Sequence, residues 1–186
     1  MQFYKDLRKI LSTRKVSFFQ LRLKKYSLKQ KIVIGKKIQQ ICKKNNIKFI
    51  VNDDPILSKT LNADGCHLGQ KDMDIKNARK IIGKKIIGVT CHNSIKLAKA
   101  AIKENADYIA FGAFFSTKTK KVIFKADIKI LNKIKKLTKT PIVAIGGINF
   151  DNYKKLLLNN ANLLAISSYV WNNKKYKPLE TIVKIK

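Results

Sequence analysis

The stretch KFIVNDDPILSKTLNADGCHL, residues 48–68, decides the fold class because one short helix separates its two strands. Residues 48–53 are mostly apolar and predict a β-strand, and residues 65–68 predict a second, very short strand. Between them, 55–62 predicts a helix with Pro55 in its first turn, where a backbone N–H has no helical partner to lose. A strand, a helix and another strand in this order are typical of a parallel sheet.

The same alternation continues on both sides of this stretch, at a repeat of roughly 20–25 residues. We count seven strands, each followed by a helical segment, so the predicted fold class is α/β, a TIM (β/α)8-type barrel with residues 1–186 as a single domain. A doubly wound sheet is the competing architecture, but its glycine-rich first turn is missing from the sequence. The other predicted strands are 16–23, 85–91, 107–114, 141–148 and 162–170, and the other predicted helices are 27–46, 75–83, 94–106, 128–138 and 151–160.

The charge of the chain is strongly positive, with 41 Lys and Arg residues against 11 Asp and Glu residues. Nucleic-acid binding would explain such a charge, but the basic residues are spread along the whole chain, and most are Lys rather than Arg. We therefore expect solvated helix faces that attract small polyanions, with no nucleic-acid partner. No apolar run reaches the ~20 residues of a membrane helix, and no secretory signal is visible, which predicts a cytoplasmic protein that does not bind membranes.

Polar residues recur at or just after the carboxyl ends of the predicted strands, where barrel enzymes hold their active sites. Alternation along the first strand places three of them on one side, pointing into the barrel, where buried polar groups would need a ligand. Five of the 11 acidic residues also fall within residues 53–74. The polar residues at strand ends are Gln20, Arg22, Lys24, Asn52, Asp53, His67, Thr90, Gly147 and Ser167.

Six segments together resemble the motifs of the thiamine phosphate synthase family. The resemblance covers roughly residues 16–170, with the motifs in the family's order. The segments are QLRLK (20–24), ND (52–53), ADGCHLGQKD (63–72), GVTCH (88–92), ADYIAFGAFFSTKTK (106–120) and PIVAIGGI (141–148).

The resemblance implies a transferase that condenses hydroxymethylpyrimidine diphosphate with hydroxyethylthiazole phosphate, giving thiamine phosphate and pyrophosphate. It implies Mg²⁺ as the cofactor, with Asp53 and Asp72 at the family's metal-binding positions. Arg22, Lys24 and Lys120 match the cations that hold the pyrophosphate, and they are the candidate catalytic residues. Because charge stabilisation and positioning can carry this reaction, it needs no obligatory general base.

The same resemblance assigns further substrate contacts. Gln20, Asn52 and Thr90 are expected at the diphosphate and pyrimidine. Backbone N–H groups of GGI (146–148) and ISS (166–168) are expected to bind the thiazole phosphate. The contacts expected on the thiazole side are Gly147, Ser167 and Ser168. Two further substrate contacts, Thr117 and Thr119, are expected in a loop that resembles the family's lid.

Other polar residues of the same region are expected to have structural roles. Asp54 and Asp74 are predicted to be capping or solvated residues, and Asp64 to make turn or cap hydrogen bonds. His67 is expected to make a structural hydrogen bond. The cysteines Cys42, Cys66 and Cys91 fit neither a zinc pattern nor a disulfide framework, and we expect reduced, buried thiols.

The sequence also departs from the family. Family members usually begin with a strand, whereas residues 2–15 predict a helix, so the first barrel strand is expected to be missing or altered. A dimer partner or the N-terminal segment could cover the two open edges, so a homodimer is one option. Leu23 replaces the Glu of the first motif. Three alternatives stay open: a TenI-like thiazole tautomerase with His92 as acid or base and no Mg²⁺, a non-catalytic barrel that binds phosphorylated ligands, and a nucleic-acid-binding protein.

Overall fold

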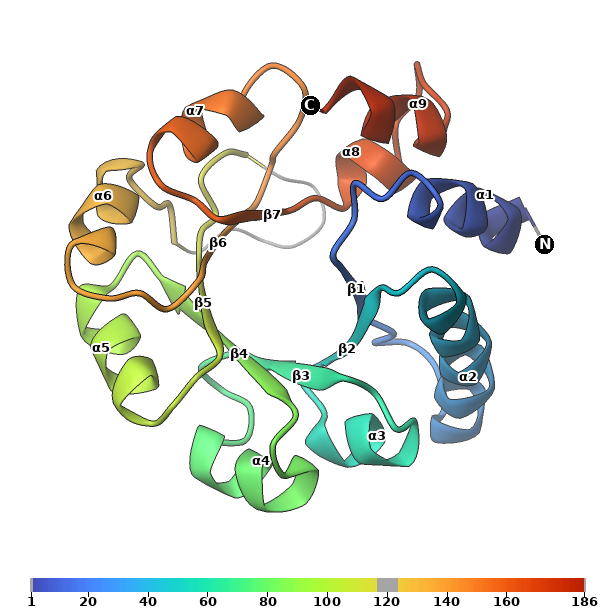
Figure 1. The fold of residues 1–186 in the computed structure, drawn as a ribbon, viewed down its shortest axis with the longest axis horizontal. Coiled ribbons are helices and arrows are strands. Elements are labelled where there is room, and N and C mark those ends of the chain that lie inside the picture. Colours follow the sequence, from blue (N-terminus) through green and yellow to red (C-terminus); the bar gives the residue numbers. More distant parts are fainter. Residues whose placement is uncertain (1, 117–123, 186) are drawn as a thin grey trace. The chain divides into compact units, whose positions relative to one another are not determined.

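The structure, a computed structural model, describes residues 2–116 and 124–185, which Figure 1 draws in colour. It divides into two compact units. Unit 1 is Met1–Ile87, and unit 2 is Gly88–Lys186. In the described residues, seven strands alternate with helices, and every strand pairing within either unit is parallel. The predicted α/β class and the strand count are therefore confirmed.

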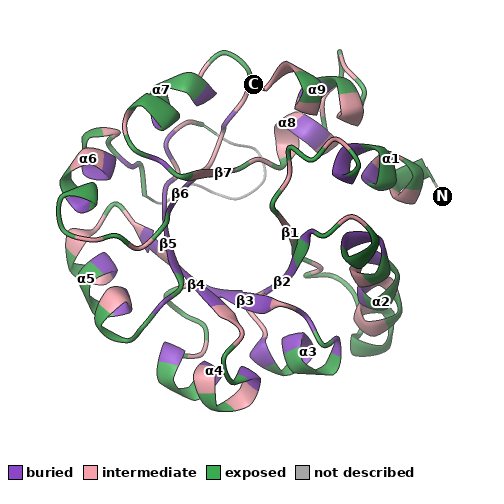
Figure 2. Ribbon diagram, in the orientation of Figure 1, coloured by how far each residue is buried: buried purple, intermediate pink, exposed green. Residues whose placement is uncertain are grey.

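Unit 1 carries a three-stranded parallel sheet in the order β1-β2-β3. Phe18 pairs with Lys48, and Ile50 pairs with Gly65. Helices α2 and α3 lie against these strands, and buried residues gather in β2, β3 and the helix sides that face them (Figure 2). The elements are α1 (Gln2–Leu11), β1 (Phe18–Leu21), α2 (Leu28–Lys44), β2 (Lys48–Asn52), α3 (Pro55–Thr60), β3 (Gly65–Leu68) and α4 (Ile75–Ile82).

Three helices of unit 1 begin at a side-chain cap. Ser27 accepts a hydrogen bond from Gln30 N, and the Gln30 side chain accepts one from Ser27 N, which forms a capping box at α2. Asp54 accepts from Leu57 N at the start of α3, and Asp74 accepts from Asn77 N at the start of α4. The capping roles of both aspartates are confirmed, because each carboxylate satisfies a backbone N–H that the helix leaves without a partner.

Unit 2 carries the strands β4-β5-β6-β7, all parallel. Ile109 pairs with Ile142, and Val143 pairs with Leu163. Ser94 caps α5 by accepting from Leu97 N, as its position predicts. The elements are β4 (Ile86–His92), which begins in the last residues of unit 1, α5 (Ile95–Lys103), β5 (Tyr108–Phe111), α6 (Lys129–Lys135), β6 (Ile142–Ile145), α7 (Tyr153–Leu158), β7 (Leu163–Ala165), α8 (Ser168–Trp171) and α9 (Pro178–Lys184).

Five strands are shorter than the sequence predicts, namely β1, β2, β5, β6 and β7, and the ends of β1 and β7 matter most for the predicted site. β1 ends at Leu21, so Arg22 and Lys24 follow the strand instead of lying in it. β7 ends at Ala165, because Ser167 leaves the extended conformation with a ψ of −74° and α8 begins at Ser168. These two differences lie at the carboxyl end of a strand, so they move predicted site residues from strands into the segments that follow.

The thiols and the helices bear on two further expectations. All three cysteines are free and buried, and burial raises the pKa of the thiols of Cys42, Cys66 and Cys91 to about 12. They are therefore unreactive protonated thiols at neutral pH, as predicted. Within residues 2–116 and 124–185, none of the helices combines the length and the apolar character that crossing a membrane requires.

Candidate active site

Two carboxyl groups lie next to each other in unit 1. Asp53 follows β2 directly, with its N–H donating to His67 O at 2.8 Å, and Asp72 follows β3, with Oδ2 accepting from Gly69 N at 2.7 Å. Asp53 has a φ of 67°, a left-handed conformation that Asp tolerates better than most side chains. Burial raises the pKa of Asp53, and so do a hydrogen bond and the charge of the Asp72 carboxyl. The fold therefore brings the two predicted metal ligands together.

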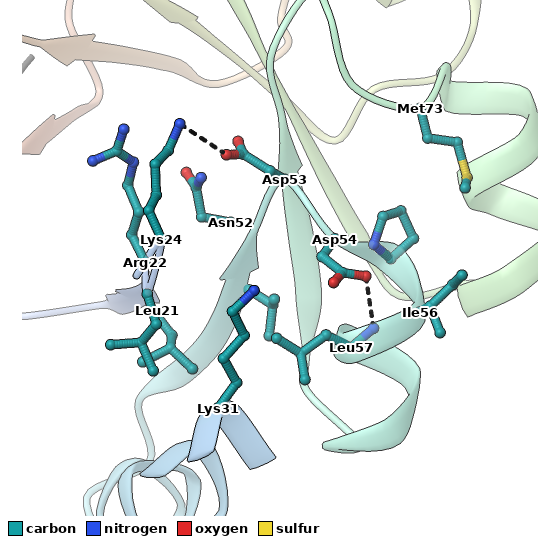
Figure 3. A pocket seen from close by; sticks show the side chains of 13 residues that line it. Leu21, Arg22, Lys24, Lys31, Asn52, Asp53, Asp54, Ile56, Leu57 and Met73 are labelled. Atoms are coloured by element: carbon teal, nitrogen blue, oxygen red, sulfur yellow. Dashed lines mark hydrogen bonds and ion pairs between the residues drawn. The ribbon is translucent and has the colours of Figure 1, made fainter. Parts of the chain in front are cut away.

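Two cations face this carboxyl pair from the end of β1. Lys24 Nζ lies 3.9 Å from Asp53 Oδ2, and Figure 3 shows Arg22 and Lys24 extending from the end of β1 on the side of Asp53. The charges of Lys24 and Arg22 lower the pKa of Asp53, which opposes the raising effects. Both side chains are exposed. The expectation that they point into a buried core was therefore wrong, and solvent stabilises them without a ligand.

A hydrogen bond between side chains orients the amide of Asn52. Gln20 Nε2 donates to Asn52 Oδ1, across the paired strands β1 and β2. Because this bond occupies the Asn52 oxygen, the Asn52 Nδ2 group is presented as a donor. The arrangement gives Gln20 a positioning role and gives Asn52 a donor that suits a phosphate oxygen.

A cavity of about 460 Å³, which unit 1 forms by itself, is bordered by Arg22, Lys24, Asn52 and Asp53. Figure 3 shows its charged side, where Lys24, Asn52 and Asp53 come close together, and an apolar side formed by residues such as Leu57. The volume suits a small phosphorylated molecule. The cavity is lined by Leu21, Arg22, Leu23, Lys24, Lys31, Val51, Asn52, Asp53, Asp54, Pro55, Ile56, Leu57 and Met73.

The carboxyl pair has the donor chemistry that Mg²⁺ prefers. In the described part of the chain, no group of three or more His, Cys, Asp or Glu side chains is placed to hold a metal ion. Mg²⁺ commonly binds one or two carboxylates and takes its remaining ligands from water and substrate phosphates. Asp53 and Asp72 therefore fit Mg²⁺ bound together with a diphosphate.

His67 and Asp64 are built into the structure around the site. The His67 side chain is 7% exposed, and burial lowers its pKa to about 4, although the Asp72 charge raises it. The imidazole is therefore neutral at pH 7. Asp64 accepts hydrogen bonds from Phe49 N at 2.9 Å and from Lys48 Nζ at 3.2 Å. These contacts confirm the hydrogen-bonding role of Asp64, which joins the start of β2 to the turn before β3.

In unit 2, Thr90 and His92 lie at the end of β4. The pairing register with β5 shifts between them, and His92 has a φ of 53°. The His92 ring lies 4.3 Å from the Phe124 ring, at an interplanar angle of 34°. Thr90 and His92 are both half-buried.

The GGI turn of unit 2 is held by backbone contacts. Gly146 and Gly147 have φ values of 95° and 66°. A Cβ on Gly147 would lie 2.4 Å from Ser116 O, and Asn152 Nδ2 donates to Gly147 O at 3.0 Å. The turn therefore needs glycine both for its conformation and for its close backbone packing.

The remaining predicted residues of unit 2 fall into two groups. Ser167 is exposed and precedes α8, and Ser168 is half-buried at the first position of that helix. Thr117, Thr119 and Lys120 lie outside the described residues. Of the cations predicted to hold pyrophosphate, the structure therefore describes Arg22 and Lys24.

Parallel strands that alternate with helices, with charged groups gathered at their carboxyl ends, define an α/β enzyme of the barrel type. The family model described as thiamine monophosphate synthase matches residues 1–170. The chain belongs to this family.

Individual relatives agree with this assignment. The chain is 66% identical over 186 residues to a thiamine-phosphate synthase of Pelagibacter ubique, covering all of this chain and 90% of that protein. It is 41% identical to a thiamine-phosphate synthase of Erythrobacter litoralis, over 84% of this chain and 75% of that protein. The predicted family and activity are confirmed by these matches, as is the predicted class of enzyme, a transferase. The alternative activities are not favoured.

Solved structures agree on the fold. Thiamine phosphate pyrophosphorylase from Pyrococcus furiosus superposes with a TM-score of 0.85 at 30% identity, over 97% of this chain and 86% of that one. A 3-hexulose-6-phosphate synthase structure gives a TM-score of 0.65 at 11% identity, over 97% and 92% of the two chains. The second match shows the fold alone, since its identity is low. The predicted barrel-type class is confirmed.

Sequence reasoning missed one charged residue of the cavity, Lys31 in α2. No motif includes this residue. It resembles the other lysines of a helix that also contains Lys29, Lys36 and Lys37. Lys31 lies in the first turn of the helix that follows β1. Whether its side chain enters the cavity depends on the angle at which α2 packs, which the sequence does not give.

Proposed function

We propose that this chain makes thiamine phosphate by binding the diphosphate of the pyrimidine substrate in the unit 1 cavity. The observation that carries the proposal is the adjacent pair Asp53 and Asp72, faced by Lys24 and Arg22. Carboxylates alone would repel a diphosphate, and cations alone would not hold a divalent metal. The combination is suited to a metal diphosphate complex.

In this proposal the side chains at the end of β1 hold the leaving group. Arg22 and Lys24 contact phosphate oxygens and stabilise the negative charge that grows as the carbon–oxygen bond breaks. Asn52 donates its Nδ2 hydrogens to a phosphate oxygen, with Gln20 fixing the amide orientation. These residues bind and orient the diphosphate and transfer no proton, in keeping with a reaction that needs no general base.

Asp53 and Asp72 would hold Mg²⁺. The bound ion would supply Lewis-acid stabilisation of the departing pyrophosphate. It would also neutralise the repulsion that now raises the pKa of Asp53. The two carboxylates would position the positive charge of the ion and would take no other part in the reaction.

The residues of unit 2 take the remaining roles. Backbone N–H groups around Gly147, Ser167 and Ser168 would bind the thiazole phosphate, and Thr90 would contact the pyrimidine. Thr117 and Thr119 keep the substrate contacts that their lid-like motif implies, and Lys120 would contact the pyrophosphate. The single domain over residues 1–186, the homodimer and the cytoplasmic location stay predictions.

The decisive experiment supplies purified protein with both phosphorylated precursors, with and without Mg²⁺, and measures thiamine phosphate by chromatography. We expect product from the wild type only with Mg²⁺, and none from Asp53→Ala. Thermal unfolding gives a second readout: Mg²⁺ should raise the Tm of the wild type more than that of Asp53→Ala. Absence of product under all conditions, with tautomerisation of the thiazole intact, would show that the proposed function is wrong.

A further inference from the structure

Lys31 places a third positive charge in the unit 1 cavity. It lies in the first turn of α2, and its side chain rises from the helix into the space beside Leu57 (Figure 3). The side chain is half-buried. No motif of the chain includes Lys31, so its presence in the cavity lining comes from the packing of α2 alone.

Among the described residues of the chain, no carboxylate neutralises this charge. Two aspartates line the cavity, and both have other partners: Asp53 faces Lys24 at 3.9 Å, and Asp54 accepts from Leu57 N to cap α3. Among residues 2–116 and 124–185, no carboxylate forms an ion pair with Lys31. The lining therefore contains three cations, Arg22, Lys24 and Lys31, and has a carboxylate ion pair for only one of them.

Helix stability does not account for a cation at this position. The first turn of α2 has no acidic residue, and the amino-terminal end of a helix carries partial positive charge, which disfavours a lysine. A bound anion would attract both the lysine and the amino-terminal end of the helix, and so would offset the repulsion between them. The half-buried setting beside apolar side chains such as Leu57 reduces solvent screening of such a contact.

We propose that Lys31 is a third cationic contact for the diphosphate, on the α2 side of the cavity. The inference rests on the proposed function for the identity of the anion. Lys31 comes from a helix, whereas Arg22 and Lys24 follow β1, so it reaches the cavity from a different side (Figure 3). It strengthens binding of the diphosphate in substrate and product alike and leaves the bond-breaking step unchanged.

Lys31→Gln tests the proposal, with Lys29→Gln as the matched control. Lys29 is exposed, lies in the same helical turn about 200° around α2, and does not line the cavity. Either substitution lowers the net charge by one and removes one positive charge from the first turn of α2. We expect Lys31→Gln to raise the KM for the pyrimidine diphosphate about fivefold, with kcat within about twofold, and Lys29→Gln to match the wild type.

A binding measurement separates this inference from the proposed function. Calorimetric titration of inorganic pyrophosphate with Mg²⁺ should give a Kd weakened about fivefold by Lys31→Gln, with Lys31→Arg near the wild type. Raising the ionic strength should shrink the difference between the Gln variants. Equal pyrophosphate affinity in the two Gln variants would overturn the role of Lys31, even if the wild type makes thiamine phosphate. A wild type that makes no product but binds pyrophosphate through Lys31 would overturn only the proposed function.

Discussion

Unit 1 presents its functional groups on side chains, and unit 2 presents them largely on the backbone. The unit 1 cavity is bordered by Arg22, Lys24 and Asp53, and the charges of the two cations lower the pKa of the Asp53 carboxyl. The corresponding feature of unit 2 is the turn at Gly146 and Gly147, which contacts neighbouring backbone atoms closely. We therefore expect diphosphate binding to depend on side-chain charges and phosphate binding to depend on backbone conformation.

The helix starts show the same contrast. In unit 1, α2, α3 and α4 begin at side-chain caps, whereas the described helices α6, α7 and α8 of unit 2 begin without a side-chain cap hydrogen bond. Ser94 at α5 is the exception in unit 2. We therefore expect stability and substrate binding in unit 1 to depend on charge, pH and metal, and those in unit 2 to depend on steric fit. Four predictions test this contrast, from the largest expected effect to the smallest.

The largest effect is expected from the carboxyl pair. Asp53→Asn and Asp72→Asn should each lower kcat/KM by about 10²–10³-fold, because each removes a proposed metal ligand. The double variant should be little worse than either single variant, since both carboxylates act through one ion. Asp127→Asn in unit 2 is the control, because Asp127 is exposed and its carboxylate accepts a hydrogen bond from Lys129 N. Additive losses in the double variant would contradict a shared ion.

The second prediction concerns the pH dependence of stability through His67. Its pKa is about 4 in the folded protein and about 6.5 when exposed, so the unfolded chain binds more protons between these values. Stability is therefore highest above pH 6.5 and falls as the pH drops toward 4, by on the order of 3 kcal/mol. Urea unfolding of the wild type and of His67→Gln at pH 4.5 and 7.5 measures this contribution as the difference between the two proteins. Parallel pH profiles would show that His67 titrates normally.

Local sequence predicted the elements around the unit 1 cavity because their signals are short. Pro55 and Asp54 mark the start of α3, and the alternation of strands and helices fixes which residues follow strand ends. The pairing of Asp53 with Asp72 came from the resemblance to the family, and the structure brings the two carboxyls together because each follows one of two neighbouring parallel strands. Hydrophobic patterning supplied only the order of the elements.

What the sequence missed depends on exact geometry. The run 16–23 suggested that alternation continues through Lys24, but β1 ends at Leu21, and the cations that follow are exposed. The apolar run 162–170 likewise predicted a longer strand, although β7 ends at Ala165. Lys31 could not be distinguished from other lysines of α2, because its entry into the cavity depends on the angle at which the helix packs. Strand ends and helix orientation are set by tertiary contacts that no local pattern contains.

The third prediction tests the backbone of unit 2. Gly147→Ala should lower the free energy of unfolding by about 2 kcal/mol, because it combines a left-handed φ with a clash against Ser116 O, and it should raise the KM for the thiazole phosphate. Gly83→Ala in unit 1 is the matched control. Its φ is 63°, but a Cβ there would meet no atom within 4 Å. Urea unfolding and steady-state kinetics should show a thiazole-specific loss for Gly147→Ala alone. If Gly147→Ala and Gly83→Ala changed the KM for the thiazole phosphate equally, the proposed role of the unit 2 backbone in binding would be wrong.

The smallest effect compares two serines at helix starts. Ser27→Ala should lower the free energy of unfolding by about 1 kcal/mol, because Ser27 accepts from Gln30 N and takes part in a capping box. Ser167→Ala, at the corresponding position of α8, should change it by less than about 0.5 kcal/mol, since Ser167 makes no side-chain cap bond there. Equilibrium urea unfolding with a common m-value measures both. A larger loss at Ser167 would mean that unit 2 also depends on side-chain hydrogen bonds, and the distinction between the two units would then rest on the carboxyl pair and the glycine turn alone.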